Sequence, residues 1–66
     1  MSVVKVIEVI ASSEKSFDDA AAQAVAEASK SVENIKSVYI KEMNANVDQG
    51  KITSYGVNAK VSFTVR

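Results

Sequence analysis

The chain has 66 residues with eight basic and eight acidic side chains, so its formal net charge is zero. This balance argues against a nucleic-acid partner or an anionic membrane surface, since both favour a basic excess. The chain contains no cysteine and no histidine, which excludes disulfide bonds and the usual zinc sites. A domain this short is marginally stable without a brace, and we therefore expect a homo-oligomer.

The first residues do not resemble a targeting segment. Charges at Lys5 and Glu8 interrupt the apolar run, and the cleavage site of a signal peptide is missing. No apolar run approaches the ~18 residues of a membrane span. We therefore expect a cytoplasmic protein.

Residues 3–11 are rich in valine and isoleucine, which indicates a β-strand. The segment is too short for a helix in a domain of this size. Both of its faces are largely apolar, whereas a strand with one wet face would alternate with polar residues. We expect both faces of this strand to pack against partners.

A helical period begins after Ser16, a natural N-cap, with Asp19 in the position of the capping-box glutamate. Apolar residues then recur at intervals of three and four and form one narrow stripe. The stripe consists of Phe17, Ala21, Ala24, Ala28 and Val32, flanked by Ala20 and Val25. Because most of these residues are alanine, a sheet can approach the helix closely. The helix is expected to end near Glu33 or Asn34.

Two strand-like segments follow, at 35–47 and 51–66, joined by the sequence DQG. A two-residue turn at Gln49 and Gly50 would pair Asp48 with Lys51 and fix the register. The predicted opposite pairs are Val38 with Val61, Tyr39 with Lys60, Ile40 with Ala59, Lys41 with Asn58, Glu42 with Val57, and Met43 with Gly56.

This register is consistent with the hydrophobic pattern. Apart from Glu42, apolar partners share one face and polar partners share the other, and a slip of one residue would mix the faces. A local β-bulge is the alternative. The order strand, helix, strand, strand predicts a single α+β domain over residues 1–66, with a three-stranded antiparallel sheet curled over one helix.

The residues give no support for catalysis. Serines are present, but there is no histidine or cysteine to act as a base or nucleophile. Gly50 and Gly56 are the only glycines and do not make a phosphate-binding loop. We therefore predict that the protein is not an enzyme.

A row of oxygen-bearing side chains is the first candidate site. Glu42, Asn44, Asn46 and Asp48 alternate along one strand, about 6.6 Å from one to the next, and Glu42, Asn44 and Asp48 are the candidate metal ligands. Calcium takes oxygen ligands of these types, but the spacing requires backbone carbonyls, water or another subunit to complete a site. The alternative interpretation is a solvated strand end whose Asn and Asp residues serve the turn.

The second candidate is a binding site for a planar ligand. Ser37 and Tyr39 lie in the row of Met43, which is predicted to face Gly56. An aromatic ring beside small residues can hold a planar molecule. The alternative is that Tyr39 packs against a neighbouring subunit and that Gly56 relieves a crowded sheet contact.

Four short segments in this order, KVIE, SFDDA, DQGKI and KVSF, resemble the dodecin family over essentially the whole chain. The resemblance implies a β-α-β-β protomer in a hollow homododecamer that binds and stores a flavin (FMN, FAD or riboflavin). Flavin-binding members stack the ring on a tryptophan and contact it with a glutamine. Those positions are Ser37 and Gly56 here.

Both departures predict weak or altered flavin binding, because serine cannot supply the ~1–3 kcal/mol of aromatic stacking. Some dodecins lack the tryptophan and are associated with calcium, and the row of Glu42, Asn44 and Asp48 resembles their acidic strand. The leading hypothesis is a dodecin-like flavin-binding and storage protein. The alternatives are a calcium-associated dodecin and a purely structural shell with a degenerate ligand site.

Overall fold

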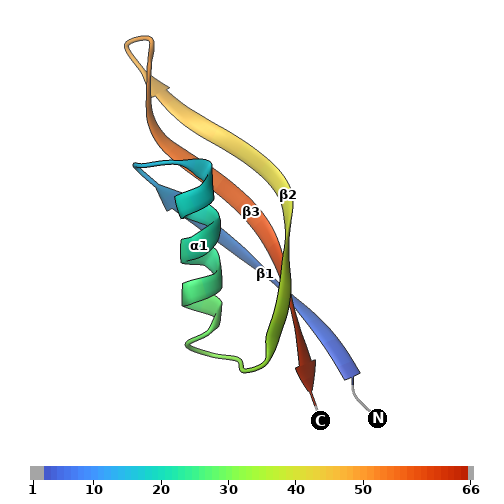
Figure 1. The fold of residues 1–66 in the computed structure, drawn as a ribbon. Coiled ribbons are helices and arrows are strands. Elements are labelled where there is room, and N and C mark those ends of the chain that lie inside the picture. The colour runs from blue at the N-terminus through green and yellow to red at the C-terminus, as the bar shows by residue number, and fades with distance from the viewer. Residues whose placement is uncertain (1–2, 66) are drawn as a thin grey trace.

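The structure is a computed structural model that describes residues 3–65. The elements are β1 (Val3–Ser13), α1 (Phe17–Ala28), β2 (Ile35–Asp48) and β3 (Lys51–Val65). The strands form one antiparallel sheet in the order β1-β3-β2, with α1 on one face (Figure 1). The predicted α+β arrangement is confirmed.

The core lies between α1 and the central strand β3. Three helix residues, Ala20, Ala24 and Ala28, are buried against the sheet. The buried apolar residues of β3 are Val57, Ala59, Val61 and Phe63. Alanine brings the helix axis close to the sheet, as the stripe predicted. The helix packs mainly on β1 and β3, which leaves Ile40 and Met43 of β2 exposed.

The helix ends at Ala28, several residues before the predicted end at Glu33 or Asn34. Ser29 is the C-cap, and its hydroxyl donates to Ala26 O at 2.7 Å. Serine side chains compete with the helix for backbone groups in this way, and such competition favours termination. The prediction was wrong because Val32 continues the apolar spacing from the loop, where it is half-buried.

The hairpin turn forms as predicted. Asp48 lies opposite Lys51, and Gln49 and Gly50 adopt φ values of 53° and 78°. Two central residues with positive φ are the signature of a tight hairpin turn that matches the twist of the strands. The pairs of Val38, Tyr39 and Ile40 with β3 are also those predicted.

Beyond Ile40 the predicted register is wrong. Glu42 lies opposite Asn58, Met43 opposite Val57, and Lys41 has no partner of its own. Lys41 is therefore the extra residue of a β-bulge. The bulge turns Glu42 to the outer, polar side of the sheet and Met43 to the helix side. Glu42, which the predicted register placed among apolar partners, therefore lies on the polar face. Thr53 is likewise left without a partner on β2, and from there to the turn the pairing again follows the predicted register.

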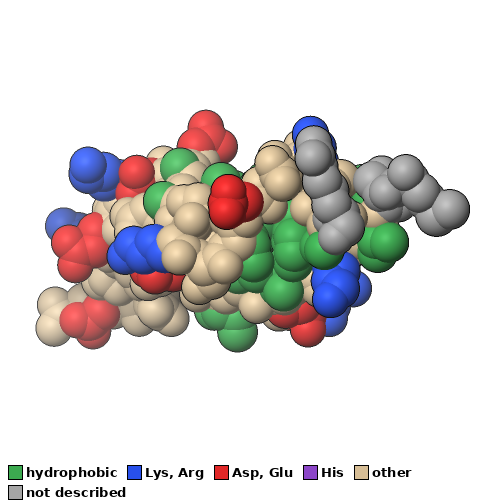
Figure 2. All heavy atoms as spheres, turned by 90° about the horizontal axis from the view of Figure 1, so that it is seen from below, with side chains coloured by type: hydrophobic (Ala, Val, Ile, Leu, Met, Phe, Trp, Pro, Cys, Tyr) green, Lys and Arg blue, Asp and Glu red, His purple; other side chains and the backbone are tan. Residues whose placement is uncertain are grey.

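The face of the sheet turned away from α1, called the outer face, carries both apolar and polar side chains. Its β1 residues Val4, Val6 and Ile10 are 61%, 55% and 80% exposed. Figure 2 shows hydrophobic side chains grouped at the surface where β1 begins and β3 ends. The helix thus covers one face of β1, whereas the other face, which was also expected to pack against a partner, is exposed in the single chain. Within residues 3–65, no helix has the length and apolar character needed to cross a membrane.

Candidate functional site

A small pocket lies on the outer face of the sheet, beside the middle parts of β2 and β3. Its volume is about 140 Å³, and it is lined by Ile10, Glu42, Asn44, Gly56, Val57 and Asn58. The register explains this grouping, because Glu42 lies opposite Asn58 and Asn44 lies opposite Gly56. Directly opposite residues on one face have Cβ atoms roughly 5 Å apart. The bulge at Lys41 therefore builds the pocket.

Oxygen atoms dominate the polar lining of this pocket. Glu42 supplies a carboxylate, and Asn44 and Asn58 supply carboxamides. Among the described residues, the Asn58 Oδ1 atom is buried and has no hydrogen-bond partner. An unpaired buried acceptor costs roughly 1–3 kcal/mol, so a ligand that satisfies it is favoured. Carboxylate and amide oxygens are the donors that calcium prefers, and the donor set fits that ion.

Gly56 forms the floor of the pocket beside Asn44. A Cβ atom built on Gly56 would lie 2.5 Å from Asn44 Oδ1. Gly50, at the turn, has positive φ, whereas Gly56 does not. A side chain at position 56 would therefore require the end of the flexible Asn44 side chain to shift, whereas the backbone conformation does not itself require glycine.

Asp48, predicted to join Glu42 and Asn44, does not line the pocket. It lies at the turn opposite Lys51, four residues beyond Asn44, or roughly 13 Å along the strand. No group of three acidic, histidine or cysteine side chains within residues 3–65 is placed to hold a metal ion. A cation bound here would therefore need further oxygens from outside the chain.

Asn58 is a pocket-lining residue that the sequence-based prediction did not include. The regular register paired it with Lys41, which hid its proximity to Glu42. One signal was available, because asparagine is disfavoured in strands and here stands between the apolar residues Val57 and Ala59.

The predicted flavin positions are not brought together within one chain. Ser37 lies opposite Ser62, and the two hydroxyl oxygens are 2.5 Å apart in a hydrogen bond. Gly56 is six positions from Ser62 along β3, or about 20 Å. Tyr39 lies between them, opposite Lys60, and is 65% exposed. A site that used all three residues would combine different subunits.

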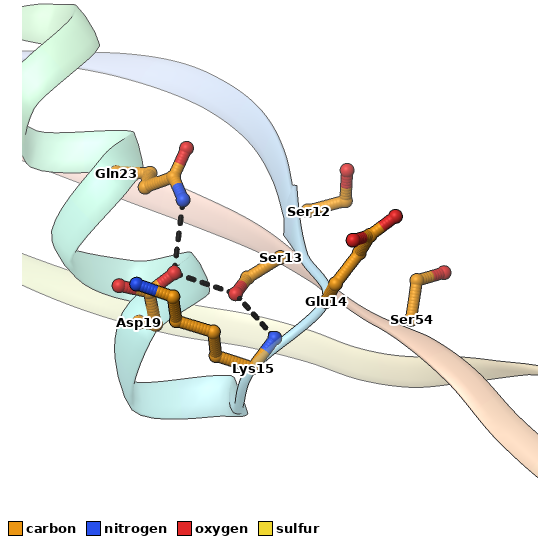
Figure 3. A pocket seen from close by; sticks show the side chains of 7 residues that line it. All are labelled: Ser12, Ser13, Glu14, Lys15, Asp19, Gln23 and Ser54. Carbon is orange, nitrogen blue, oxygen red and sulfur yellow. Dashed lines mark hydrogen bonds between the residues drawn. The ribbon is translucent and has the colours of Figure 1, made fainter.

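A larger hollow of about 430 Å³ lies where β1 turns into α1 (Figure 3). Asp19 Oδ2 accepts hydrogen bonds from Ser13 Oγ at 2.5 Å and from Gln23 Nε2 at 2.9 Å. The bond from Ser13, followed by that from Gln23, lowers the pKa of Asp19. The backbone N–H groups of Lys15 and Asp19 donate to Ser13 Oγ and Ser16 Oγ. These groups satisfy one another, so the cluster braces the start of the helix.

Ser16 is confirmed as the N-cap by the bond from the Asp19 N–H at 2.9 Å. The carboxylate of Asp19 is engaged by Ser13 and Gln23. A glutamate would reach back to the backbone of the cap residue. The shorter aspartate instead ties the helix to the end of β1.

Known proteins resemble this chain over its full length. A family model for dodecins matches residues 3–66. A calcium dodecin from Mycobacterium tuberculosis is 45% identical over 67 residues, which cover 100% of this chain and 93% of that protein. A solved structure of calcium dodecin from that organism, described as having a novel calcium-binding site, is 42% identical, with a TM-score of 0.81 over 97% of this chain and 91% of its own.

Dodecins of lower identity share the fold. The structure of dodecin from Streptomyces davaonensis superimposes with a TM-score of 0.91 at 22% identity, over 98% of this chain and 96% of its own. The match of the family model and the 45% identity confirm the resemblance that the four sequence segments indicated. The chain belongs to the dodecin family.

Proposed function

We propose that this chain is a calcium-associated dodecin that binds the cation in the outer-face pocket through Glu42, Asn44 and Asn58. The buried, unpaired Asn58 Oδ1 beside Glu42 is the observation that carries the proposal. The 45% identity to a protein named calcium dodecin supports it. This was the alternative to flavin binding in the sequence-based prediction.

The proposed site is completed by other subunits. Calcium takes about six to eight oxygen ligands, more than the three pocket side chains supply. The lone chain is elongated, with a radius of gyration of 13.5 Å, whereas a compact domain of this length has about 11 Å. Together with the exposed apolar residues of β1, this shape supports assembly with further copies of the chain. The proposed assembly is a homododecamer in the cytoplasm that binds and stores its ligand without catalysis.

Calcium titration by calorimetry, together with thermal melting, tests the proposal. At a free calcium concentration 100 times Kd, binding should stabilise the protein by about 2.7 kcal/mol. Glu42→Gln should weaken calcium binding at least about tenfold, because it removes the pocket's carboxylate charge. Glu33→Gln, which removes an exposed carboxylate outside the pocket, is the matched control and should leave the affinity unchanged. Calcium binding by Glu42→Gln equal to the wild type would contradict the proposed site.

Weak flavin binding is the second candidate function. The exposed ring of Tyr39 on the outer face supports it, because an aromatic face can stack on a planar ligand. Riboflavin fluorescence should be quenched only at high protein concentration. Tyr39→Ala should abolish that quenching, and unchanged quenching in this variant would exclude Tyr39 as the stacking residue.

A further inference from the structure

We infer that Gly56 is a positioning residue that holds Asn44 in the pocket and thereby selects a small cation over a planar ligand. This inference rests on the proposed calcium site, since it names the residue that orients one of its oxygen donors. It also gives a reason for a glycine in the interior of a strand, where glycine is normally destabilising.

The contact between Asn44 and Gly56 is direct. The two residues lie opposite each other on the outer face. The Asn44 Oδ1 atom is only 2.5 Å from the place that a Cβ atom on Gly56 would occupy. The carboxamide of Asn44 therefore lies across β3 in the space left by the missing side chain. Any other residue at position 56 would force this carboxamide to move.

The position of this carboxamide determines which donors converge. The neighbouring pair on the same face is Glu42 with Asn58, whose Oδ1 is buried and unpaired. With Asn44 lying over Gly56, the oxygens of all three side chains line one pocket. If Asn44 rotated away from β3, the pocket would lose one of its three oxygen-bearing side chains, and a hard cation would lose a ligand.

The same contact works against a planar ligand. A flat ring needs open surface above the strand, and the Asn44 carboxamide already fills the space above Gly56. The pocket that remains has a volume of about 140 Å³, below the range of roughly 300–1,000 Å³ for small-molecule sites. The pair therefore favours an ion, with its water, as the occupant.

A double-mutant cycle in the assembled protein tests this inference. Gly56→Ala, Asn44→Ala and the double variant are compared by calorimetric titration with calcium chloride. Each single change should weaken calcium binding roughly tenfold. The double variant should be no weaker than Asn44→Ala alone, because the alanine at position 56 then has no carboxamide to displace. Asn46→Ala is the matched control, since Asn46 bonds Ser54 outside the pocket, and it should bind calcium as the wild type does.

Melting in EDTA gives a readout that does not depend on calcium. Gly56→Ala should raise Tm in the Asn44→Ala background, because alanine restricts the unfolded chain more than glycine does. In the wild-type background, displacement of Asn44 should reduce or reverse this gain. An equal Tm change in both backgrounds, or undiminished calcium affinity in Gly56→Ala, would overturn the inference. If the wild type does not bind calcium, the proposed function fails, and the Tm comparison still decides whether Gly56 positions Asn44.

Discussion

Rebuilding a flavin site in this chain should require three substitutions instead of two. Ser37→Trp with Gly56→Gln restores the two groups that flavin-binding dodecins use at these positions. The new glutamine places its Cβ 2.5 Å from Asn44 Oδ1. We therefore expect the double variant to bind riboflavin less tightly than a triple variant that also carries Asn44→Ala.

The magnitude follows from the contacts that are gained and lost. The tryptophan adds roughly 1–3 kcal/mol of stacking, so the triple variant should bind riboflavin at least about tenfold more tightly than the wild type, equivalent to about 1.4 kcal/mol. Ser37→Trp also removes the hydrogen bond between the Ser37 and Ser62 hydroxyls, worth about 1 kcal/mol. That cost falls on stability and not on affinity, because the bond exists before the ligand binds.

Quenching of riboflavin fluorescence measures the affinity, and light scattering confirms that each variant is assembled. Ser37→Trp alone is the control for stacking without the change at Gly56. Equal affinity of the double and triple variants would show that Asn44 does not obstruct position 56. A fully assembled triple variant with the riboflavin affinity of the wild type would refute the assignment of Ser37 and Gly56 to the flavin positions.

Three further predictions concern stability and assembly. Val61→Ala, at a residue that is 0% exposed, should cost about 2–3 kcal/mol in urea unfolding, and a smaller loss would place the core elsewhere. Asp19 has a lowered pKa in the folded chain, so its ionised carboxylate stabilises the fold at pH values above about 4. This stabilisation is lost as the pH falls through the folded-state pKa of Asp19. Asp19→Asn should therefore reduce the fall of Tm at acid pH, and an unchanged fall of Tm would contradict this role of Asp19. Val6→Asp should dissociate the oligomer in light scattering, and an intact assembly would exclude Val6 from the interface.

Local signals were sufficient to predict much of the fold. Ser16 marked the helix start because its hydroxyl can cap the first turn, and the sequence at Gln49 and Gly50 marked the hairpin. The helix end was missed because Val32 keeps the helical spacing although the chain has already left the helix. Apolar spacing identifies the buried stripe but not the residue at which backbone bonding stops.

The candidate site was only partly predictable, for a different physical reason. The alternation along β2 correctly grouped Glu42 with Asn44. A β-bulge adds one residue without changing composition, so the period of two does not reveal that Lys41 is unpaired. The partner Asn58 depends on this bulge, since it comes from pairing between strands. Asp48 belonged to the predicted row but does not line this pocket, because a row on one strand does not show which positions share a pocket.

Lys41 and Thr53, the unpaired residues at the irregularities on either side of the pocket, determine where this part of the hairpin tolerates a change of length. Deletion of either residue would remove its bulge and leave the pairs on both sides, and the faces of their side chains, as they are. Deletion of Met43, within the regular run, would turn Asn44 towards the helix and remove it from the pocket. Dodecins that differ by one residue in this hairpin should therefore keep the pocket when the difference falls at a bulge, and lose it when the difference falls between the bulges.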